Sequence, residues 1–475
     1  MKYSYLILLL IGLCLQYTSI AKEHDLHLTL IPPGMITNQV PLDIRAGLKN
    51  HTAETQRWSV EIYLDKVKKK NLLYNATHVL QAGGALEIKH VIPKGSLLGR
   101  HTIILKVRGA RKNYIVKKEV EVVAADMRST QTIDGAWAGI YHWSEVEGKH
   151  WNGDIRQLTD DQWKTMVGGM RKLGMDMVVI QEVFRNDAYA GKHQLTPENY
   201  PGKSFYPSAL YSARMDITAK DPVEAILAAA DSLGMHVWVG VGLFAWFDFS
   251  PASLEWHKRV AGELWQRYGH HPSFYGFYVS EEMGGSLDNW ETTDSLRQFR
   301  KKEMIHFFKE FRQYCSSIAP AKPIMLATNS MQVPMGADAY PGLLQYLDVL
   351  CPFGFARMPE NDLTGKEAAD LLQSFCDAAG AHLWFDLEAF LFNPDTSLYP
   401  RDMEGILGDL TMFKNFEKIL CYQYPGVFSD PAAGFRVGEV STIPLFEQYQ
   451  LYQQKQRDRL KQATAFKQNK KKVKK

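Results

Sequence analysis

The feature that most limits the possible folds of this 475-residue chain is a regular alternation of two kinds of segment between residues 134 and 452. Short apolar runs bounded by polar or turn-forming residues predict β-strands. Longer stretches between them predict helices, and one of these has a Thr/Asp cap at 159–161 and ends at Gly174. Eight such strand–helix units predict a (β/α)8 TIM barrel, an α/β fold. The predicted strands are 136–141, 177–181, 236–243, 274–280, 323–328, 347–352, 381–387 and 419–424.

An open, doubly wound α/β sheet is the main alternative for alternating strands and helices. Such a sheet usually carries a glycine-rich nucleotide-binding loop after its first strand. Residues 142–147 follow the first strand here and read His-Trp-Ser-Glu-Val-Glu, without glycine. The barrel is therefore favoured. Helices are expected at 159–174, 221–234, 251–268, 296–317, 364–379, 402–416 and 442–455, with a short or irregular helix between strands five and six.

A different pattern occupies residues 24 to 125. Apolar and polar residues alternate there with period two, and Gly, Pro and Asn turns separate the runs. This pattern predicts a small all-β sandwich like an immunoglobulin or fibronectin module, and no catalytic constellation occurs in it. The expected domains are therefore a sandwich at 22–126, a barrel at 127–457 and a basic, disordered tail at 458–475.

The first residues are typical of a signal peptide at 1–21. Met1-Lys2 precedes an apolar run at 5–15 that is too short to span a bilayer as a stable helix. Ser19-Ile-Ala21 fits the small-residue rule for cleavage, so export to the periplasm or the outside is expected. Lipid anchoring at Cys14 is less favoured, because the bulky Leu13 stands where such sites have a small residue. No later segment predicts a transmembrane helix.

The net charge of +3 is concentrated at one end of the chain. Seven lysines and no acids lie in 461–475, and removing these charges leaves −4 for the rest. That is not the basic footprint of a nucleic-acid-binding protein. The hydrophobic fraction of 45% and the charged fraction of 23% are those of an ordinary soluble globular protein.

Four cysteines remain after the expected cleavage. None forms a CxxC pair and all occur in apolar contexts, so buried free thiols are expected, although export would permit a disulfide. The chain also has no HExxH motif and no paired Cys/His spacing, so a zinc site is not expected. The four cysteines are Cys315, Cys351, Cys376 and Cys421.

Two strand ends carry the strongest chemical signal. Residues 276–285 read Gly-Phe-Tyr-Val-Ser-Glu-Glu-Met-Gly-Gly and place Glu282 at the end of strand four. Residues 383–390 read Leu-Trp-Phe-Asp-Leu-Glu-Ala-Phe and place Glu388 at the end of strand seven. The C-terminal strand ends of a barrel meet at one mouth, and two carboxylates across it are the groups that cleave a glycosidic bond. An ion pair at the rim is the alternative for each acid.

Strand alternation separates the neighbouring acids. Glu282 shares a face with Tyr278 and Ser280, whereas Glu281 shares the mostly apolar face that packs against helices. Glu282 is thus the better candidate for the barrel interior, and Glu281 for a supporting contact or salt bridge. Asp386 lies on the same face as Glu388.

Several other strand ends carry acids, amides or aromatic residues that suit a sugar. The aromatic fraction of 12%, with 11 Trp and 22 Tyr, is on the rich side, and sugar rings stack on aromatic faces. Core packing is the alternative for each aromatic residue, and a purely structural role is the alternative for His142. The candidates for substrate binding are Glu182, Glu281, Asp386, His142, Trp143, Trp246, Asn329 and Tyr424.

The two acids and the eight-unit layout together resemble the clan A glycoside hydrolases over about 134–452. In that clan a glutamate ending strand four is the acid/base and a glutamate ending strand seven is the nucleophile. The resemblance thus implies these roles for Glu282 and Glu388. The run 276–282 also resembles a secreted bacterial barrel family of unassigned function that often carries an N-terminal sandwich.

The chain departs from the clan at two places. Glu281 stands where the clan usually has the asparagine that holds the sugar 2-hydroxyl. Strand six offers Phe353 and Phe355 instead of the usual His or Tyr near the nucleophile.

The expected function is a retaining glycoside hydrolase that acts on an oligo- or polysaccharide. Glu282 would stay protonated near neutral pH and Glu388 would attack the anomeric carbon. This reaction implies no metal and no organic cofactor. An inverting glycosidase and a noncatalytic glycan-binding barrel are alternatives, and a scaffold or adhesion role through the sandwich is a further one. A saccharide is the expected partner, and the sequence specifies no oligomeric state.

Overall fold

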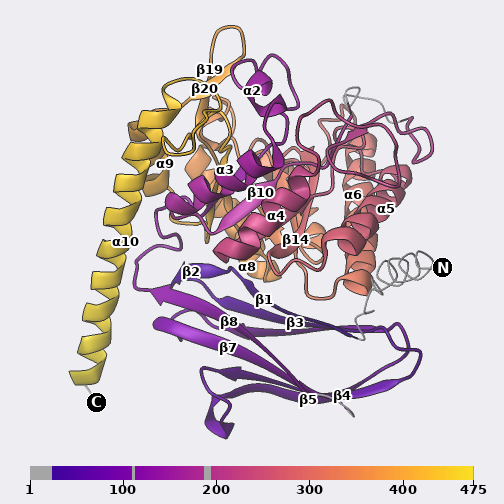
Figure 1. Ribbon diagram of the computed structural model, residues 1–475, viewed down its shortest axis with the longest axis vertical. Helices are drawn as coiled ribbons and strands as arrows, with labels where there is room; N and C mark the ends of the chain where they lie inside the picture. Colours follow the sequence, from indigo (N-terminus) through magenta and orange to yellow (C-terminus); the bar gives the residue numbers. More distant parts are fainter. Residues whose placement is uncertain (1–23, 110–112, 187–193, 474–475) are drawn as a thin grey trace, which may run out of the picture.

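The computed structural model describes residues 24–109, 113–186 and 194–473 (Figure 1). An all-β region at the N-terminal end of the chain lies against a larger α/β region. The predicted signal peptide and Cys14 fall outside the described residues.

The all-β region consists of two sheets that share one hydrophobic cluster. One sheet is antiparallel and contains β1 (His24–Ile31), β3 (Leu42–Asn50) and β6 (Ala85–Ile92), in the order β1-β3-β6. The other contains β2 (Gly34–Thr37), β4 (Gln56–Leu64), β5 (Leu72–Leu80), β7 (Gly99–Arg108) and β8 (Asn113–Val123), in the order β2-β8-β7-β4-β5. A 3-10 turn, η1 (Lys69–Asn71), precedes β5.

Side chains from both sheets form this cluster. Ile44 on β3 and Ile103 on β7 belong to it, and neither is exposed to solvent. Alternate residues of the strands reach this core, as period-two alternation predicts. A two-sheet β domain is therefore observed, while its likeness to immunoglobulin or fibronectin modules stays a prediction.

A single parallel sheet forms the centre of the α/β region. Its hydrogen-bonded order is β17-β16-β15-β14-β13-β10-β9-β21-β18. The strands are β9 (Gly135–Ala138), β10 (Met177–Ile180), β13 (His236–Gly240), β14 (Phe274–Met283), β15 (Ile324–Thr328), β16 (Val349–Leu350), β17 (His382–Leu383), β18 (Phe385–Glu388) and β21 (Ile419–Tyr422).

The first and last members of this order, β17 and β18, belong to one strand. Only Trp384 separates β17 from β18 in the chain, while β17 pairs with β16 and β18 pairs with β21. They are the two halves of a seventh strand that is interrupted at Trp384. The sheet is therefore the nearly closed parallel barrel that the eight strand–helix units predict.

Helices cover the outside of the barrel, and their ends lie at residues that the sequence marks. α3 (Asp160–Lys172) begins after Thr159, whose hydroxyl accepts a hydrogen bond from the Gln162 N–H in a capping box. α4 (Pro222–Leu233) ends at Gly234, which has the left-handed φ of 63°. The other helices are α2 (Asn152–Arg156), α5 (Pro251–Tyr268), α6 (Asp294–Ile318), α8 (Gly365–Ala379), α9 (Met403–Met412) and α10 (Thr442–Val473).

The connections that the structure describes contain short helical turns and two hairpins. The irregular segment predicted between strands five and six is η2 (Val333–Gly336) followed by α7 (Tyr340–Leu343). A 3-10 turn, η3, spans Phe355–Arg357 after β16. Two small hairpins pair β11 (Phe184–Arg185) with β12 (Lys203–Ser204) and β19 (Phe390–Phe392) with β20 (Leu398–Pro400).

The all-β region covers the N-terminal ends of the barrel strands. The hydroxyl of Tyr275, at the start of β14, donates a hydrogen bond of 2.7 Å to the Leu30 carbonyl. The ammonium of Lys418, just before β21, donates one of 2.8 Å to the Met35 carbonyl. Because this end of the barrel is closed by another domain, the C-terminal strand ends at the opposite mouth are the place to look for a functional site.

Helix α10 runs along the barrel and continues beside the all-β region (Figure 1). The Thr464 hydroxyl accepts a hydrogen bond of 2.8 Å from the Ala124 N–H, and the Gln468 amide donates one of 3.0 Å to the Leu98 carbonyl. The prediction of a disordered tail at 458–475 is therefore wrong for residues 458–473. These residues stay helical and contact the β domain.

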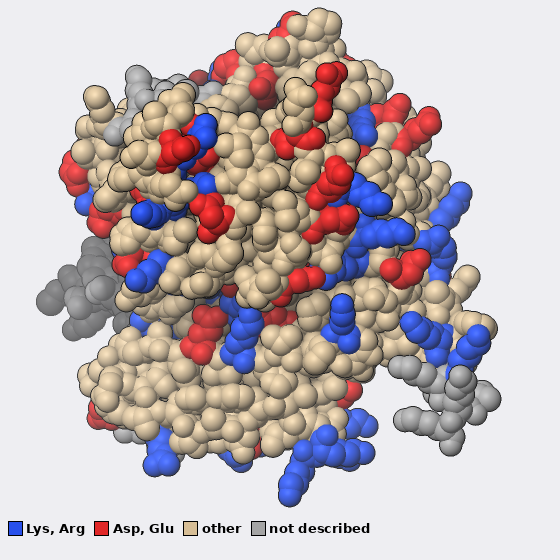
Figure 2. Space-filling model, turned by 180° about the vertical axis from the view of Figure 1, so that it is seen from behind, with Lys and Arg blue, Asp and Glu red and all other residues tan. Residues whose placement is uncertain are grey.

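The four predicted thiols are free and buried, as expected: Cys315, Cys351, Cys376 and Cys421. In the part of the chain that the structure describes, no helix is both long enough and apolar enough to cross a membrane. On the face seen in Figure 2, acidic and basic side chains are interspersed over the barrel. No single sign of charge dominates that part of the surface.

Candidate active site

A cavity of about 340 Å³ opens at the C-terminal ends of the barrel strands. Aromatic side chains form much of its wall: Trp137, Trp143, Trp246, Phe247, Tyr278, Trp290, Phe353, Phe390, Phe392 and Tyr422. Polar side chains also line it: Glu147, Gln181, Glu282, Asn329, Arg357, Asp386 and Glu388. A concave, largely apolar site with a few converging polar groups is the usual setting for ligand binding, so this cavity is the candidate active site.

Glu282 lies near the end of β14, where the strand leaves its regular pairing. The register with β15 shifts between Val279 and Met283. The Glu282 carboxyl is partly buried and is hydrogen-bonded by the Trp246 side chain. Burial raises the pKa of Glu282 to about 7; the Trp246 hydrogen bond and the Arg357 charge oppose this shift, and the Glu388 charge adds to it. Near neutral pH this group is divided between carboxylic acid and carboxylate.

Glu388, at the end of β18, is bound by an arginine. Nε of Arg357 donates to both carboxylate oxygens, at 3.0 and 3.1 Å, and Nη2 contacts the first of them. The guanidinium also lies over the Phe392 ring, 5.6 Å from its centroid. Only 7% of Glu388 is exposed. The charge-assisted hydrogen bonds therefore hold this carboxylate in a fixed orientation at the cavity wall.

Two further acids face the same cavity. Burial and the charge of Glu282 raise the pKa of Glu147 to about 7, against the opposing effect of Arg357. Burial raises the pKa of Asp386 well above its ordinary value, and the charges of Glu388 and Glu282 add to this. Arg357 is the one Lys or Arg among the described lining residues, so the four carboxyl groups cannot all be ionised at little cost.

A row of four aromatic rings runs along the cavity wall. The Trp143 and Trp246 centroids lie 5.3 Å apart, and Trp246 stacks on Phe247 at 4.6 Å. Phe247 in turn meets Trp290 edge to face at 4.9 Å. Trp290 is 44% exposed. The row therefore extends an apolar aromatic surface, with its rings at different tilts, from the acids toward solvent.

Six of the residues predicted from the sequence come together in this cavity: Glu282, Glu388, Asp386, Trp143, Trp246 and Asn329. Strand alternation explains why Glu282, and not Glu281, faces the cavity on β14. Tyr278 and Glu282 share a face and both line the cavity, whereas Glu281 does not.

Two predicted substrate-binding residues point elsewhere. Glu281 is fully buried, and its Oε1 accepts hydrogen bonds from the backbone N–H groups of Phe244 (2.7 Å) and Ala245 (3.2 Å). It supports the loop after β13, as strand alternation predicted, and its place among the substrate-binding candidates was wrong. Tyr424 follows the end of β21 and packs outward against α3, where Gly169 leaves room for its hydroxyl. Tyr422, not Tyr424, lines the cavity.

His142 and Glu182 also lie outside the cavity lining, contrary to the prediction. His142 is fully buried, its Nδ1 accepts a hydrogen bond of 3.1 Å from the Ser144 N–H, and burial lowers its pKa to about 4. Glu182 is 1% exposed. Strand β10 ends at Ile180 and Gln181 takes the position that faces the cavity, so Glu182 points to the other side.

Sequence reasoning missed Arg357, Glu147 and Trp290. Arg357 lies in η3, whose start is marked by Gly354 with a left-handed φ of 86°. Glu147 follows the first predicted strand in a loop that has no periodic pattern. The sequence could have predicted Tyr278 and Tyr422 as cavity residues, because strand alternation places both on the cavity-facing side of their strands.

The carboxyl groups of the cavity do not form a cluster that could hold a metal ion. Among the described residues, the group of three or more ligand side chains close enough to do so is Glu224, His270 and His271, from α4 and the connection after α5. None of these three lines the cavity.

This chain is similar to known proteins over part of its length. The chain is 27% identical to beta-glucuronidase of Canis lupus familiaris over 132 residues, which are 27% of this chain and 17% of the canine protein. This chain therefore matches only a small part of that relative's length.

Solved structures of two Bacteroides proteins share a broad similarity. One protein, from Bacteroides thetaiotaomicron VPI-5482, is provisionally assigned as an alpha-L-fucosidase. It is 16% identical, with a TM-score of 0.47 over 68% of this chain and 93% of that one. Bacteroides uniformis beta-glucuronidase 2 is 12% identical, with a TM-score of 0.39 over 90% of this chain and 50% of that one.

One family profile covers most of the barrel. It matches residues 133–434, which include strands β9 to β21 and every residue named above as lining the cavity. Because this match spans more than half of the chain, the protein belongs to the family described as "Domain of unknown function (DUF4434)".

Proposed function

We propose that this protein is a glycoside hydrolase that acts on an oligo- or polysaccharide. One observation carries the proposal: two glutamates, on the fourth and seventh barrel strands, share one cavity in different electrostatic surroundings. Glu282 has a pKa of about 7 and can hold a proton, whereas Glu388 forms an ion pair with Arg357. Cleavage of a glycosidic bond by two carboxyl groups needs one of each kind.

In the proposed retaining reaction the two acids act on opposite ends of the scissile bond. Glu282 gives its proton to the glycosidic oxygen as the bond to the anomeric carbon breaks, and Glu388 forms a bond to that carbon. Glu282, now ionised, then takes a proton from water, whose oxygen displaces Glu388. The row from Trp143 to Trp290 supplies flat surfaces on which neighbouring sugar rings can stack.

Glu147 supports an inverting reaction as the second candidate. Its carboxyl lines the same cavity, and burial together with the charge of Glu282 raises its pKa. In an inverting enzyme a carboxylate activates water directly, and no bond forms between the protein and the sugar. The configuration of the first product distinguishes the two reactions, because retention needs two displacements at the anomeric carbon and inversion needs one.

The test is hydrolysis of aryl glycosides, followed by proton NMR of the first sugar anomer released. Aryl β-glucuronides come first, because the canine relative is a beta-glucuronidase. We expect turnover by the wild type, loss of turnover in Glu388→Gln, and no change in Glu360→Gln, an exposed control. A product of unchanged anomeric configuration supports retention, and an inverted product supports the role of Glu147.

A noncatalytic glycan-binding barrel predicts a different outcome. Oligosaccharide binding would be measurable by calorimetry, no aryl glycoside or polysaccharide would be cleaved, and Glu282→Gln would bind as tightly as the wild type. That combination of results would replace the hydrolase proposal.

We also propose that the protein is exported, on the basis of the signal-peptide pattern at 1–21. Amino-terminal sequencing of the chain secreted by a bacterial host tests this. A mature chain that starts at Lys22 is the expected result, and an uncleaved Met1 would contradict it.

A further inference from the structure

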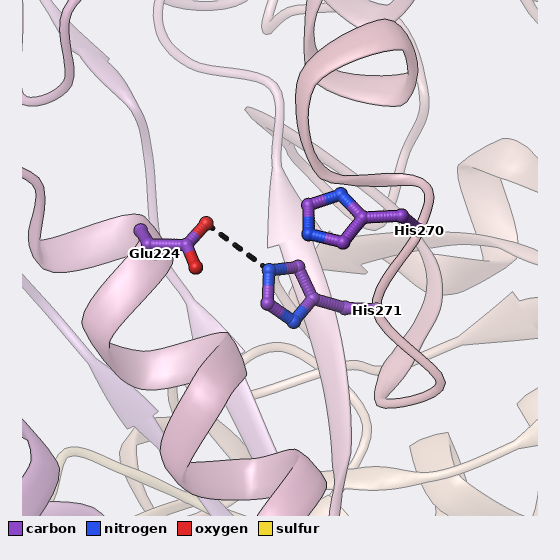
Figure 3. A group of neighbouring side chains, drawn as sticks. All are labelled: Glu224, His270 and His271. Atoms are coloured by element: carbon purple, nitrogen blue, oxygen red, sulfur yellow. Dashed lines mark hydrogen bonds and ion pairs between the residues drawn. The ribbon is translucent and has the colours of Figure 1, made fainter. Parts of the chain in front are cut away.

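We propose that Glu224, His270 and His271 form a binding site for a divalent transition-metal ion of the zinc type, on the outside of the barrel. Glu224 lies in the first turn of α4, and the two histidines follow the end of α5. One ligand atom from each residue lies within 4.8 Å of the others. Figure 3 shows the carboxylate and the two imidazole rings turned toward one another.

The hydrogen bonds around the two rings favour metal binding through Nε2. Nδ1 of His271 lies 2.6 Å from the Asp231 carboxylate, and Nδ1 of His270 lies 3.1 Å from the Arg267 carbonyl. Each acceptor fixes a proton on Nδ1 and leaves the Nε2 lone pair available. Metal-binding histidines usually have this arrangement, in which the second nitrogen donates to a carboxylate or a carbonyl.

The contact between His271 and Glu224 requires a proton or a metal ion between the two groups. Nε2 of His271 lies 3.1 Å from a Glu224 carboxylate oxygen, while its Nδ1 already faces Asp231. A neutral ring with its proton on Nδ1 would put a lone pair against a carboxylate. Either a second proton or a metal ion must therefore lie between the two groups. A separation of 3.1 Å is close to that of two ligands on one tetrahedral zinc ion, given metal–ligand bonds of about 2.0–2.2 Å.

The position of His270 favours a metal ion over a second proton. Its ring lies 4.1 Å from the His271 ring, centroid to centroid, so a second base faces the position between His271 and Glu224. His270 is exposed, and in the described part of the chain its Nε2 has no hydrogen bond. Two imidazole nitrogens and a carboxylate oxygen suit zinc, and water can take the fourth position. No short sequence motif marks this site, because the fold brings Glu224 to the two histidines.

Calorimetric titration of the full chain with zinc chloride tests the proposal, after removal of any polyhistidine tag and treatment with EDTA. We expect one zinc ion per chain, and an affinity that falls at least about tenfold in His270→Ala and in Glu224→Gln. His306→Ala is the matched control, since His306 is also exposed and lies outside the cluster. Zinc should raise the melting temperature of the wild type and of this control, but not that of His270→Ala.

Cobalt(II) provides a second measurement on the unaltered chain. Bound cobalt should show the strong visible absorption of a low-coordinate complex with nitrogen ligands, and zinc should displace it. Absence of stoichiometric binding, or binding that is equally tight in His270→Ala, would overturn the proposal. In that case the contacts of His271 with Asp231 and Glu224 are structural hydrogen bonds. None of these readouts depends on the hydrolase activity.

Discussion

The two ends of the barrel use the same ionisable residue types in opposite ways. At the end covered by the β domain, the buried acids are paired with cations. Arg45 contacts Asp43 and Asp348, and Lys418 contacts Asp134 at 2.9 Å. At the open mouth, four carboxyl groups share one guanidinium, that of Arg357.

The pKa values of Asp43 and His382 at the covered end, and of Glu282 and Glu147 at the mouth, follow this difference. Asp134 is an exception, because burial raises its pKa to about 6 in spite of Lys418. Burial alone would raise the pKa of Asp43, but His382 and Arg45 outweigh it and hold that pKa well below its ordinary range. Burial alone would lower the pKa of His382, but Glu417 and Asp43 raise it to about 9. At the mouth burial prevails, and both Glu282 and Glu147 reach about 7. The ion pairs at the covered end stabilise the fold. The acids at the mouth have few cations nearby, so they keep protons that a reaction can use.

The sharpest test of this contrast compares two adjacent glutamates. Glu282→Gln should lower kcat/KM about 10²- to 10⁴-fold on a glycoside with a poor leaving group, because a general acid is lost. Glu281→Gln should change it little, because Glu281 lies outside the cavity lining, burial raises its pKa well above its ordinary value, and the amide oxygen can still accept the two backbone hydrogen bonds. Steady-state kinetics of both variants provides the measurement. Equal losses would remove the distinction between the two acids.

At the covered end, Arg45→Met should lower the free energy of unfolding by about 3–5 kcal/mol, because it removes a cation from Asp43 and Asp348 while both stay buried. Urea unfolding followed by circular dichroism measures this. Arg100→Met is the matched control in the same domain, since Arg100 is 79% exposed and its ion pair should contribute no more than about 1 kcal/mol. Similar losses in the two variants would contradict a special role for the buried network.

The carboxyl groups of Asp43 and Glu282, one at each end, should also respond to pH in opposite directions. Asp43 has a lowered pKa, so its contribution to stability is present above its ordinary value of 3.8 and is lost as the pH falls. Glu282 has a raised pKa, so the folded chain binds more protons than the unfolded chain between 4.5 and about 7, and stability falls as the pH rises through that window. Melting temperatures from pH 5 to 8 should therefore fall less steeply in Glu282→Gln than in the wild type. Parallel curves would show that the Glu282 pKa is not raised.

The smallest expected effect concerns the indole at the mouth. Trp246→Phe keeps an aromatic ring but removes the hydrogen bond to Glu282, which lowers the pKa of that acid. The pKa of Glu282 should therefore rise, as measured by carbon NMR of the labelled carboxyl groups. Phe247→Leu is a suitable control, because it alters the same aromatic row without removing a hydrogen bond to Glu282. An unchanged or lowered pKa in Trp246→Phe would contradict this role of the indole.

The barrel and its central acids could be read from the sequence because both depend on local patterns. The alternation of strands and helices predicted the parallel sheet, and period two placed Glu282 inward and Glu281 outward. Arg357 and Glu147 could not be found in this way, because irregular connections carry them and the fold brings them to the cavity.

Tyr424 and the C-terminal segment show where local patterns fail. The strand that carries Tyr424 was predicted to extend to 424, but β21 ends at Tyr422, so the aromatic residue that reaches the cavity is two positions earlier. Lysine-rich composition suggested disorder after 458, but residues 458–473 are helical and contact the β domain.

The position of α10 has a consequence for the order in which the chain can assemble. During synthesis the β domain emerges first, the barrel strands follow, and α10 is made after them. Its hydrogen bonds to Ala124 and Leu98 therefore connect the end of the chain to the first domain only after every barrel strand has left the ribosome. Fastening of the two domains by α10 is thus a late step, and until α10 emerges the domains are held by direct contacts such as the hydrogen bonds from Tyr275 to Leu30 and from Lys418 to Met35.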